Sequence, residues 1–210
     1  MKSGLRSVED NKVMGAQLKI TRDHILPLSD FGKVREERRG EIVNLKKRRR
    51  MEIGPHANCN FECYDTMWWQ IHEMLRIENG GDAQIDDELS AYNPLIPNGN
   101  ELVCTVMFEI PDKARRNSVL AILGGVEETM YIQLAGEMSI QGISETDLDR
   151  TTASGKASSV QFIHFPFLKD QIIKFCEPST EVIVGFNHPN YAHMSVMSDV
   201  IRTELAEDFS

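Results

Sequence analysis

The sequence predicts an α+β domain built around a mostly antiparallel sheet flanked by helices. Strand and helix patterns are mixed along the 210 residues, but they do not alternate strictly as in a parallel α/β fold. Several strand patterns are separated only by short turns, and a short turn can join only antiparallel neighbours. Because this length suits one domain, we expect a single domain over residues 17–210 and a flexible N-terminal tail over residues 1–16.

The predicted helices follow apolar residues that recur three and four positions apart. The clearest pattern covers residues 66–79, where Met67, Ile71 and Leu75 share one face. Further helices are expected over residues 31–49, 82–92, 111–123 and 168–176, and in a C-terminal segment where Met194 and Leu205 share a face.

The predicted strands are short runs rich in β-branched and aromatic residues. They cover residues 51–55, 60–64, 102–110, 129–134, 138–143, 160–167 and 181–186. Ala135-Gly136 lies between two of these runs and predicts a β-hairpin.

A long polar stretch, residues 144–159, has no periodicity. Loops of this length in compact domains are uncommon and are often lids. Gly155-Lys156 lacks the earlier glycine of a phosphate-binding loop, because Arg150 stands there. Lys156 is therefore interpreted as a lid residue that can reach an anion.

Charge and hydropathy disfavour nucleic-acid-binding, membrane and secreted proteins. The net charge of −9 disfavours a general nucleic-acid or anionic-membrane surface. No run approaches the roughly 18 apolar residues of a membrane helix, and Met1–Gln17 has no secretory signal pattern. Among the four cysteines, Cys104 and Cys176 are predicted to be reduced thiols in the core. We therefore expect a cytoplasmic protein.

One segment is positively charged, although the chain as a whole has a negative net charge. Lys33–Arg50 carries nine Lys and Arg residues against three Glu. It is either a patch for RNA, phosphate or an acidic partner, or the solvated face of a helix with cations near its C-terminus. No aromatic residue interleaves the charges, which favours the second interpretation.

Four residues have the side chains that zinc prefers. His56, Cys59 and Cys63 are closely spaced, and His72 follows. Cysteine pairs in zinc sites usually bracket a tight turn, whereas Cys63 lies in a strand pattern. Reduced cysteines beside a turn histidine are therefore the favoured interpretation.

A polar face accompanies the clearest helix. Gln70, Glu73 and Arg76 recur every third residue, and Glu62 ends the preceding strand. Glu73 and Arg76 are spaced to form an ion pair. The alternative is a pocket floor in which the carboxylates act as base or ligand. Both interpretations remain open.

A turn after the last predicted strand presents two histidines. His188 lies within Asn187–Asn190, and His193 follows five residues later. The two side chains could share a metal ion, or His188 packs into the turn.

The adjacent Trp68 and Trp69 point about 100° apart on a helix. Trp69 therefore fills a second apolar cluster or contacts another copy in a homodimer.

A wider set of residues resembles an uncharacterised bacterial family, DUF3501 (a domain of unknown function). The resemblance covers the chain from about Ile20 onward and is carried by Gly54-Pro55, Phe61-Glu62, Thr66, Gln70-Ile71, Glu73–Arg76, Glu88-Leu89, Tyr92–Pro97, Glu109, Asp112, Gly155-Lys156 and His188-Pro189-x-Tyr191. The matching positions imply nine candidate ligand-binding residues: Glu62, Gln70, Glu73, Arg76, Tyr92, Asn93, Glu109, Lys156 and His188. Gln161 stands where the pattern usually has a histidine.

The resemblance implies a function only by association. Genes of the family often lie beside those of a rubrerythrin-like di-iron protein and an iron–sulfur oxidoreductase. This implies an accessory or partner protein in oxidative-stress or iron-linked redox defence. The alternative is a small-molecule-binding or metal-dependent enzyme. Such an enzyme needs its candidate side chains to converge in one cleft, whereas an accessory protein lets them form separate structural contacts.

Overall fold

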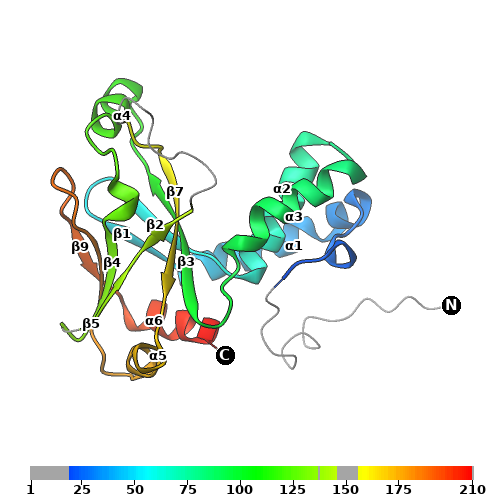
Figure 1. The fold of residues 1–210 in the computed structure, drawn as a ribbon. Helices are drawn as coiled ribbons and strands as arrows, with labels where there is room; N and C mark the ends of the chain where they lie inside the picture. Colours follow the sequence, from blue (N-terminus) through cyan, green and yellow to red (C-terminus); the bar gives the residue numbers. More distant parts are fainter. Residues whose placement is uncertain (1–18, 137, 146–155, 210) are drawn as a thin grey trace.

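The protein was analysed as a computed structural model that describes residues 19–136, 138–145 and 156–209 (Figure 1). The predicted tail, residues 1–16, and residues 146–155 of the predicted lid lie outside the described residues. The α+β prediction is confirmed, because the described residues contain six α-helices and two antiparallel sheets. The single sheet expected from the sequence is therefore two sheets.

All neighbouring strands in both sheets pair antiparallel. The five-stranded sheet has the order β1 (Arg50–Ile53), β2 (Ala57–Phe61), β3 (Glu101–Phe108), β7 (Val160–Pro166) and β6 (Ile143–Ser144). The four-stranded sheet has the order β5 (Met138–Gln141), β4 (Met130–Leu134), β8 (Val182–Phe186) and β9 (Met194–Val196). We call the two sheets and the helices at their ends the β body.

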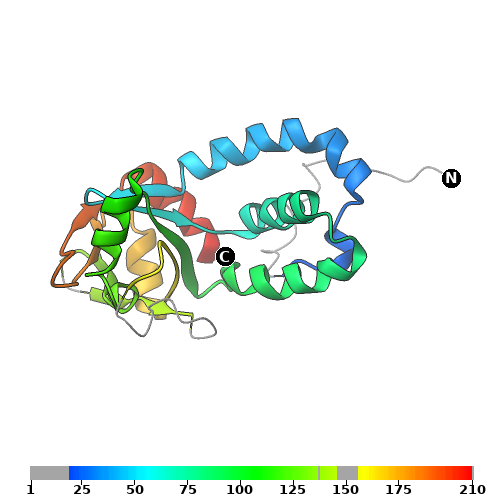
Figure 2. The ribbon, with the colours of Figure 1, turned by 90° about the horizontal axis from the view of Figure 1, so that it is seen from above.

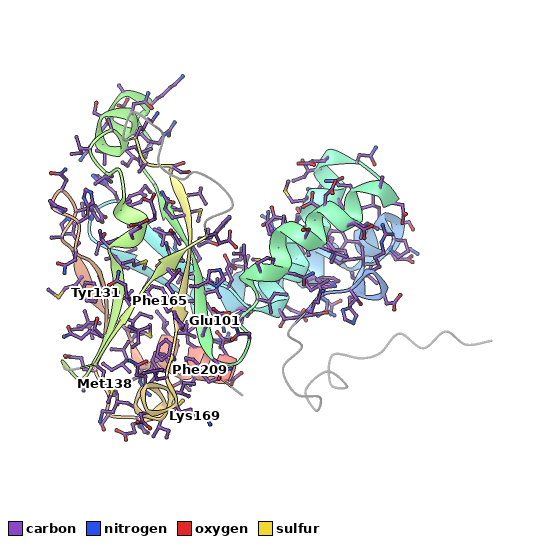
Figure 3. The ribbon with its side chains drawn as sticks, in the orientation of Figure 1. Glu101, Tyr131, Met138, Phe165, Lys169 and Phe209 are labelled. Carbon is purple, nitrogen blue, oxygen red and sulfur yellow. The ribbon has the colours of Figure 1, made fainter. Side chains whose placement is uncertain are left out.

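The main core lies between the two sheets. Side chains alternate along each strand, so one face of β3 contributes Leu102, Cys104 and Val106 to this core. Phe165 of β7, labelled in Figure 3, is fully buried there. The opposite face of the five-stranded sheet, which we call the outer face, carries the apolar Val103 and the polar Thr105 of β3.

Gly142 lets the chain pass from one sheet to the other between β5 and β6. Its backbone N–H donates to the carbonyl of Met130 at 2.8 Å. A Cβ at this position would lie 2.6 Å from Ile163 Cγ2 and 2.9 Å from the Met130 oxygen. Glycine is therefore required by close approach of the two sheets.

The other edges of the sheets meet at β1 and β9. Ser195 Oγ of β9 donates to the carbonyl of Glu52 at 2.6 Å. The prediction that Met194 belongs to the last helix is wrong, because Met194–Val196 pairs with β8. The helix α6 (Asp199–Ala206) begins later, where Ser198 Oγ accepts from the backbone of Ile201.

Helices cover both ends of the β body (Figure 1). The helix α4 (Lys113–Leu120) lies at one end, and α5 (Lys169–Cys176) lies with α6 at the other. Phe209, which follows α6, packs its ring 4.9 Å from Phe167 and 5.5 Å from Phe175 (Figure 3). This aromatic cluster fixes the end of the chain beside α5.

Three further helices project away from the β body (Figures 1 and 2). They are α1 (Leu28–Lys47), α2 (Tyr64–Glu78) and α3 (Ile85–Tyr92). The short 3-10 turn η2 (Arg22–His24) precedes α1, η3 (Asp82–Gln84) connects α2 to α3, and η4 (Asn93–Leu95) follows α3. We call residues 19–47 and 64–95 the helical lobe. The five-stranded sheet lies between this lobe and the four-stranded sheet.

Two apolar clusters hold the helical lobe together. One joins Met67, Ile71 and Leu75 of α2 to Val103 on the outer face of β3, so it also attaches the lobe to the sheet. The other packs Phe31 of α1 against α2, where its ring lies 5.6 Å from that of Trp69. Trp69 thus fills a second apolar cluster, one of the two roles expected for it.

Candidate functional site

The nine candidate residues, all within the described part of the chain, lie in several places rather than in one cleft. Their hydrogen bonds and ion pairs run to different elements of the fold. Two pairs among them touch, Glu73 with Arg76 and Gln70 with Tyr92. We describe these residues first and then the features that the sequence did not reveal.

Glu73 is the centre of an ion-pair cluster between α1 and α2. Arg35 of α1 donates to both of its oxygens, at 2.7 and 3.0 Å, and Arg76 donates to Oε2 at 3.0 Å. The hydrogen bond from Arg35 is the largest cause that lowers the pKa of Glu73 to about 2. The ion-pair interpretation of this face therefore fits the structure, with Arg35 as an additional partner.

Glu73→Gln is expected to lower the free energy of unfolding by about 1–2 kcal/mol near neutral pH, allowing for solvent screening. A carboxyl whose folded pKa is depressed stabilises the fold above its ordinary pKa of 4.5, and this contribution is lost as the pH falls toward about 2. Urea unfolding at several pH values should show the difference between the two proteins shrinking over this range.

The matched control is Glu41→Gln, because Glu41 pairs with Arg38 on an exposed face of α1. This change should stay within about 0.5 kcal/mol of the original protein. Equal stability of the Glu73 variant and the original protein at every pH would show that Glu73 is not a structural ion-pair member.

Gln70, Tyr92 and Asn93 hold the helical lobe together. Burial raises the pKa of Tyr92, and a hydrogen bond with Gln70 opposes that shift. The amide of Asn93 accepts from the backbone N–H of Ile20 at 2.7 Å and donates to its carbonyl at 3.0 Å. Asn93 therefore attaches the first described residues to η4.

Glu109 and Lys156 lie on the β body. Glu109 Oε2 accepts from Asn58 at 2.7 Å and from Arg50 at 3.2 Å. Lys156 Nζ donates to Asn117 Oδ1 on α4 at 3.0 Å. These contacts place the two residues in separate polar clusters.

His188 is buried in the turn after β8. Its Nε2 lies 3.2 Å from the carbonyl of Gly124, and its Nδ1 accepts from the backbone of Asn190 at 3.2 Å. His193 is exposed and packs edge-on against Tyr191. The structure favours the interpretation of His188 as a packed turn residue over a metal site shared with His193.

The residues considered for zinc take up separate roles. His72 is buried, where its Nε2 accepts from the backbone of Leu26 at 2.9 Å and its Nδ1 contacts the carbonyl of Trp68 at 2.7 Å. Cys59 lies in the core, and Cys63 caps the start of α2. Cys104 lies in the core as predicted, whereas the prediction of a core position for Cys176 is wrong, because Cys176 is exposed at the end of α5. Within the described ranges, no group of three or more His, Cys, Asp or Glu residues is placed to hold a metal ion.

Most of the cationic side chains in the basic segment Lys33–Arg50 form ion pairs or hydrogen bonds within the protein. Arg48 donates to Glu204 of α6 at 2.7 Å. Arg49 is only 3% exposed and donates to the carbonyls of Phe61 and Glu62, each at 3.0 Å, and to Asp208. The solvated-face interpretation therefore holds for only part of this segment.

Glu62 lies on the polar outer face of the five-stranded sheet and is 5% exposed. Its Oε1 accepts from Thr105 Oγ1 at 2.6 Å, whereas its buried Oε2 has no hydrogen-bond partner. The buried Nδ2 of Asn60, two residues earlier on the same face, also has none. A buried polar atom without a hydrogen-bond partner lowers the stability of the fold. Glu62 differs from the other candidate residues because its carboxylate contains such an atom.

His164, which sequence reasoning missed, lies between two carboxylates on the same face. Its Nδ1 is 3.1 Å from Glu101 Oε2, and its Nε2 is 3.7 Å from Glu145 Oε1. The hydrogen bond with Glu101 is the largest cause that raises the pKa of His164. Alternation along residues 160–167 could have placed His164 on the outer face, but Glu101 lies on β3 and Glu145 follows β6.

A second missed feature is an apolar groove of about 430 Å³ on the helical lobe. It lies where η2, the start of α1, the end of α2 and α3 meet. Its lining residues are Arg22, Ile25, Leu26, Pro27, Leu28, Leu75, Gly81, Asp82 and Ile85. Another hollow of about 500 Å³ involves Asn93 together with Lys19, Leu89, Ser90 and Pro94. Both features depend on contacts between separate segments.

These features define an α+β protein with a two-sheet antiparallel body and a projecting helical lobe that carries an apolar groove. The chain belongs to the family described as protein of unknown function (DUF3501), whose family model matches residues 19–209. The resemblance seen in the sequence is thereby confirmed.

A solved structure has the same fold. It is the crystal structure of a novel protein of unknown function from Burkholderia pseudomallei K96243, with 32% sequence identity and a TM-score of 0.85. The similarity covers 91% of this chain and 100% of that chain. No curated protein matches the sequence. Across the described residues, no helix has the length and apolar character needed to cross a membrane.

Proposed function

We propose that this protein is an accessory protein that docks onto a partner protein through its helical lobe. The apolar groove on the lobe is the observation that carries the proposal. Two of its lining residues are accessible, because Leu28 is 39% exposed and Ile85 is half-buried. Apolar surface that is concave and accessible is typical of binding sites.

The arrangement of the candidate residues also supports docking over catalysis. Glu73 pairs with Arg35, Asn93 binds the backbone of Ile20, and His188 binds the backbone of its own turn and of Gly124. Residues engaged in this way position elements of the fold. An enzyme that used them together would need one cleft that contains them.

The expected partners come from the family association. We propose a rubrerythrin-like di-iron protein or an iron–sulfur oxidoreductase, within oxidative-stress or iron-linked redox defence in the cytoplasm. All four cysteines are free, which is consistent with a reducing compartment. Nucleic acid is not an expected partner, because the net charge is −9 and much of the basic segment is paired.

One observation favours the alternative, a small-molecule-binding or metal-dependent enzyme. The carboxylate of Glu62 is buried and keeps one oxygen without a partner. Mass spectrometry of the native protein would support this alternative if it detected a stoichiometric bound species that is lost in Glu62→Gln. The same mass for the protein before and after denaturation would contradict it.

The docking proposal is tested with purified proteins. The full chain is titrated by isothermal calorimetry with the rubrerythrin-like and iron–sulfur proteins encoded in the same genome. We expect a complex with at least one of them, with a Kd below about 100 µM. Light scattering on this chain alone reports whether it is a homodimer. The absence of binding to both proteins at this concentration would overturn the proposed partners.

A further inference from the structure

The groove on the helical lobe has an apolar floor. Leu75 is 4% exposed, and Ile25, Leu26 and Ile85 are half-buried. A volume of about 430 Å³ lies in the range of roughly 300–1,000 Å³ that is typical of ligand pockets. The groove therefore suits a few apolar side chains rather than a flat protein face.

One edge of the groove is acidic. Arg22 donates to both oxygens of Asp86, at 2.7 and 2.9 Å, and to Asp82 at 3.0 Å. The side chains of Asp82 and Asp86 are 84% and 69% exposed, so two carboxylates face solvent around a single cation. This edge therefore keeps a negative charge.

We propose that the groove binds an apolar segment of the partner protein in which lysines or arginines flank the apolar residues. The apolar side chains occupy the floor formed by Leu75 and Ile85, and the cations approach Asp82 and Asp86. An acidic segment would bring like charges together at this edge, which disfavours binding. This inference rests on the proposed docking function and adds the chemistry of the partner segment.

The test uses two fluorescein-labelled peptides with the same leucine positions, flanked by lysines in one and by glutamates in the other. Fluorescence anisotropy with the full chain is expected to show at least about tenfold tighter binding of the lysine peptide at low salt. Added salt should reduce the difference, because exposed charges are screened. Equal binding of both peptides would overturn the inference.

Two variants locate the binding. Ile85→Asp should weaken binding of the lysine peptide at least about tenfold, because it places a charge on the apolar floor. Ile122→Asp is the matched control, since Ile122 is 55% exposed on the β body, and it should have no effect. Asp82→Lys changes an exposed residue without disturbing the core and should reduce or reverse the preference for lysine. An unchanged preference in Asp82→Lys would overturn the inference.

The same variants separate this inference from the proposed function. If a redox partner binds and neither Ile85→Asp nor Asp82→Lys changes its Kd, docking stands and the role of the groove is wrong. If the lysine peptide binds in the groove and no redox partner binds, the groove chemistry stands and the proposed partners are wrong. Dimers that Ile85→Asp converts to monomers would assign the groove to a second copy and overturn the inference. Displacement of the lysine peptide by a synthetic peptide of residues 1–18 would assign it to this chain's own N-terminus, with the same consequence.

Discussion

Replacing Arg49 with methionine is expected to lower the free energy of unfolding by about 3–5 kcal/mol. Arg49 connects the end of α1 to β2 and to Asp208, which follows α6. Its removal leaves the carbonyls of Phe61 and Glu62 and the Asp208 carboxylate buried without their cation. Burial already raises the pKa of Asp208 to about 6, and the charge of Arg49 opposes that shift.

The measurement is urea unfolding followed by far-UV circular dichroism at pH 8, where Asp208 is ionised. Arg39→Met is the matched control. Arg39 lies in α1 and is exposed, so its replacement should change the free energy of unfolding by less than about 0.5 kcal/mol. Similar losses for the two variants would show that the buried cluster around Arg49 is not a major source of stability.

Phe31→Ala is expected to destabilise the helical lobe by about 3–5 kcal/mol. The Phe31 side chain is fully buried, and its ring lies 4.8 Å from that of His72 and 6.0 Å from that of Trp68. Truncation removes the main apolar contact of α1 with α2 and leaves a cavity between them. Because the cluster is separate from the core of the β body, the effect should be greatest within the lobe.

Tryptophan fluorescence reports this change selectively, since Trp68 and Trp69 are the two tryptophans of the chain and both lie in α2. In Phe31→Ala, the fluorescence transition should shift to lower urea concentration by more than the circular dichroism transition. The control Val43→Ala, at a 48% exposed position of the same helix, should change stability by less than about 0.5 kcal/mol. Coincident, unshifted transitions in Phe31→Ala would contradict the prediction.

Tertiary contacts explain why the candidate site was predicted only in part. The pairing of Glu73 with Arg76 follows from their spacing on one helix. Arg35, which makes the shorter hydrogen bond to Glu73, lies 38 residues away. Likewise, Glu101 and Glu145 meet His164 because β3 and β6 flank β7. In these other pairs the residues are far apart in the sequence, so no local sequence pattern predicts that they meet.

Local sequence patterns correctly predicted the helices and turns whose formation depends on residues close together in the chain. The spacing of Met67, Ile71 and Leu75 predicted the helix observed as α2, within two residues at its start. Ala135 and Gly136 both have positive φ, the conformation that turns the chain between β4 and β5, and glycine adopts it without strain. In these cases the physical cause lies within a few residues of the effect.

Only the tertiary structure decided how these elements are arranged. The separation into two sheets depends on the crossing at Gly142, where the strands approach too closely for a side chain. The strand assignment of Met194–Val196 depends on pairing with β8, and the groove depends on the meeting of η2, α2 and α3. Helix periodicity and turn preferences act between neighbours in the sequence. Strand order, ion-pair partners and concave surfaces come from contacts between residues far apart in the chain.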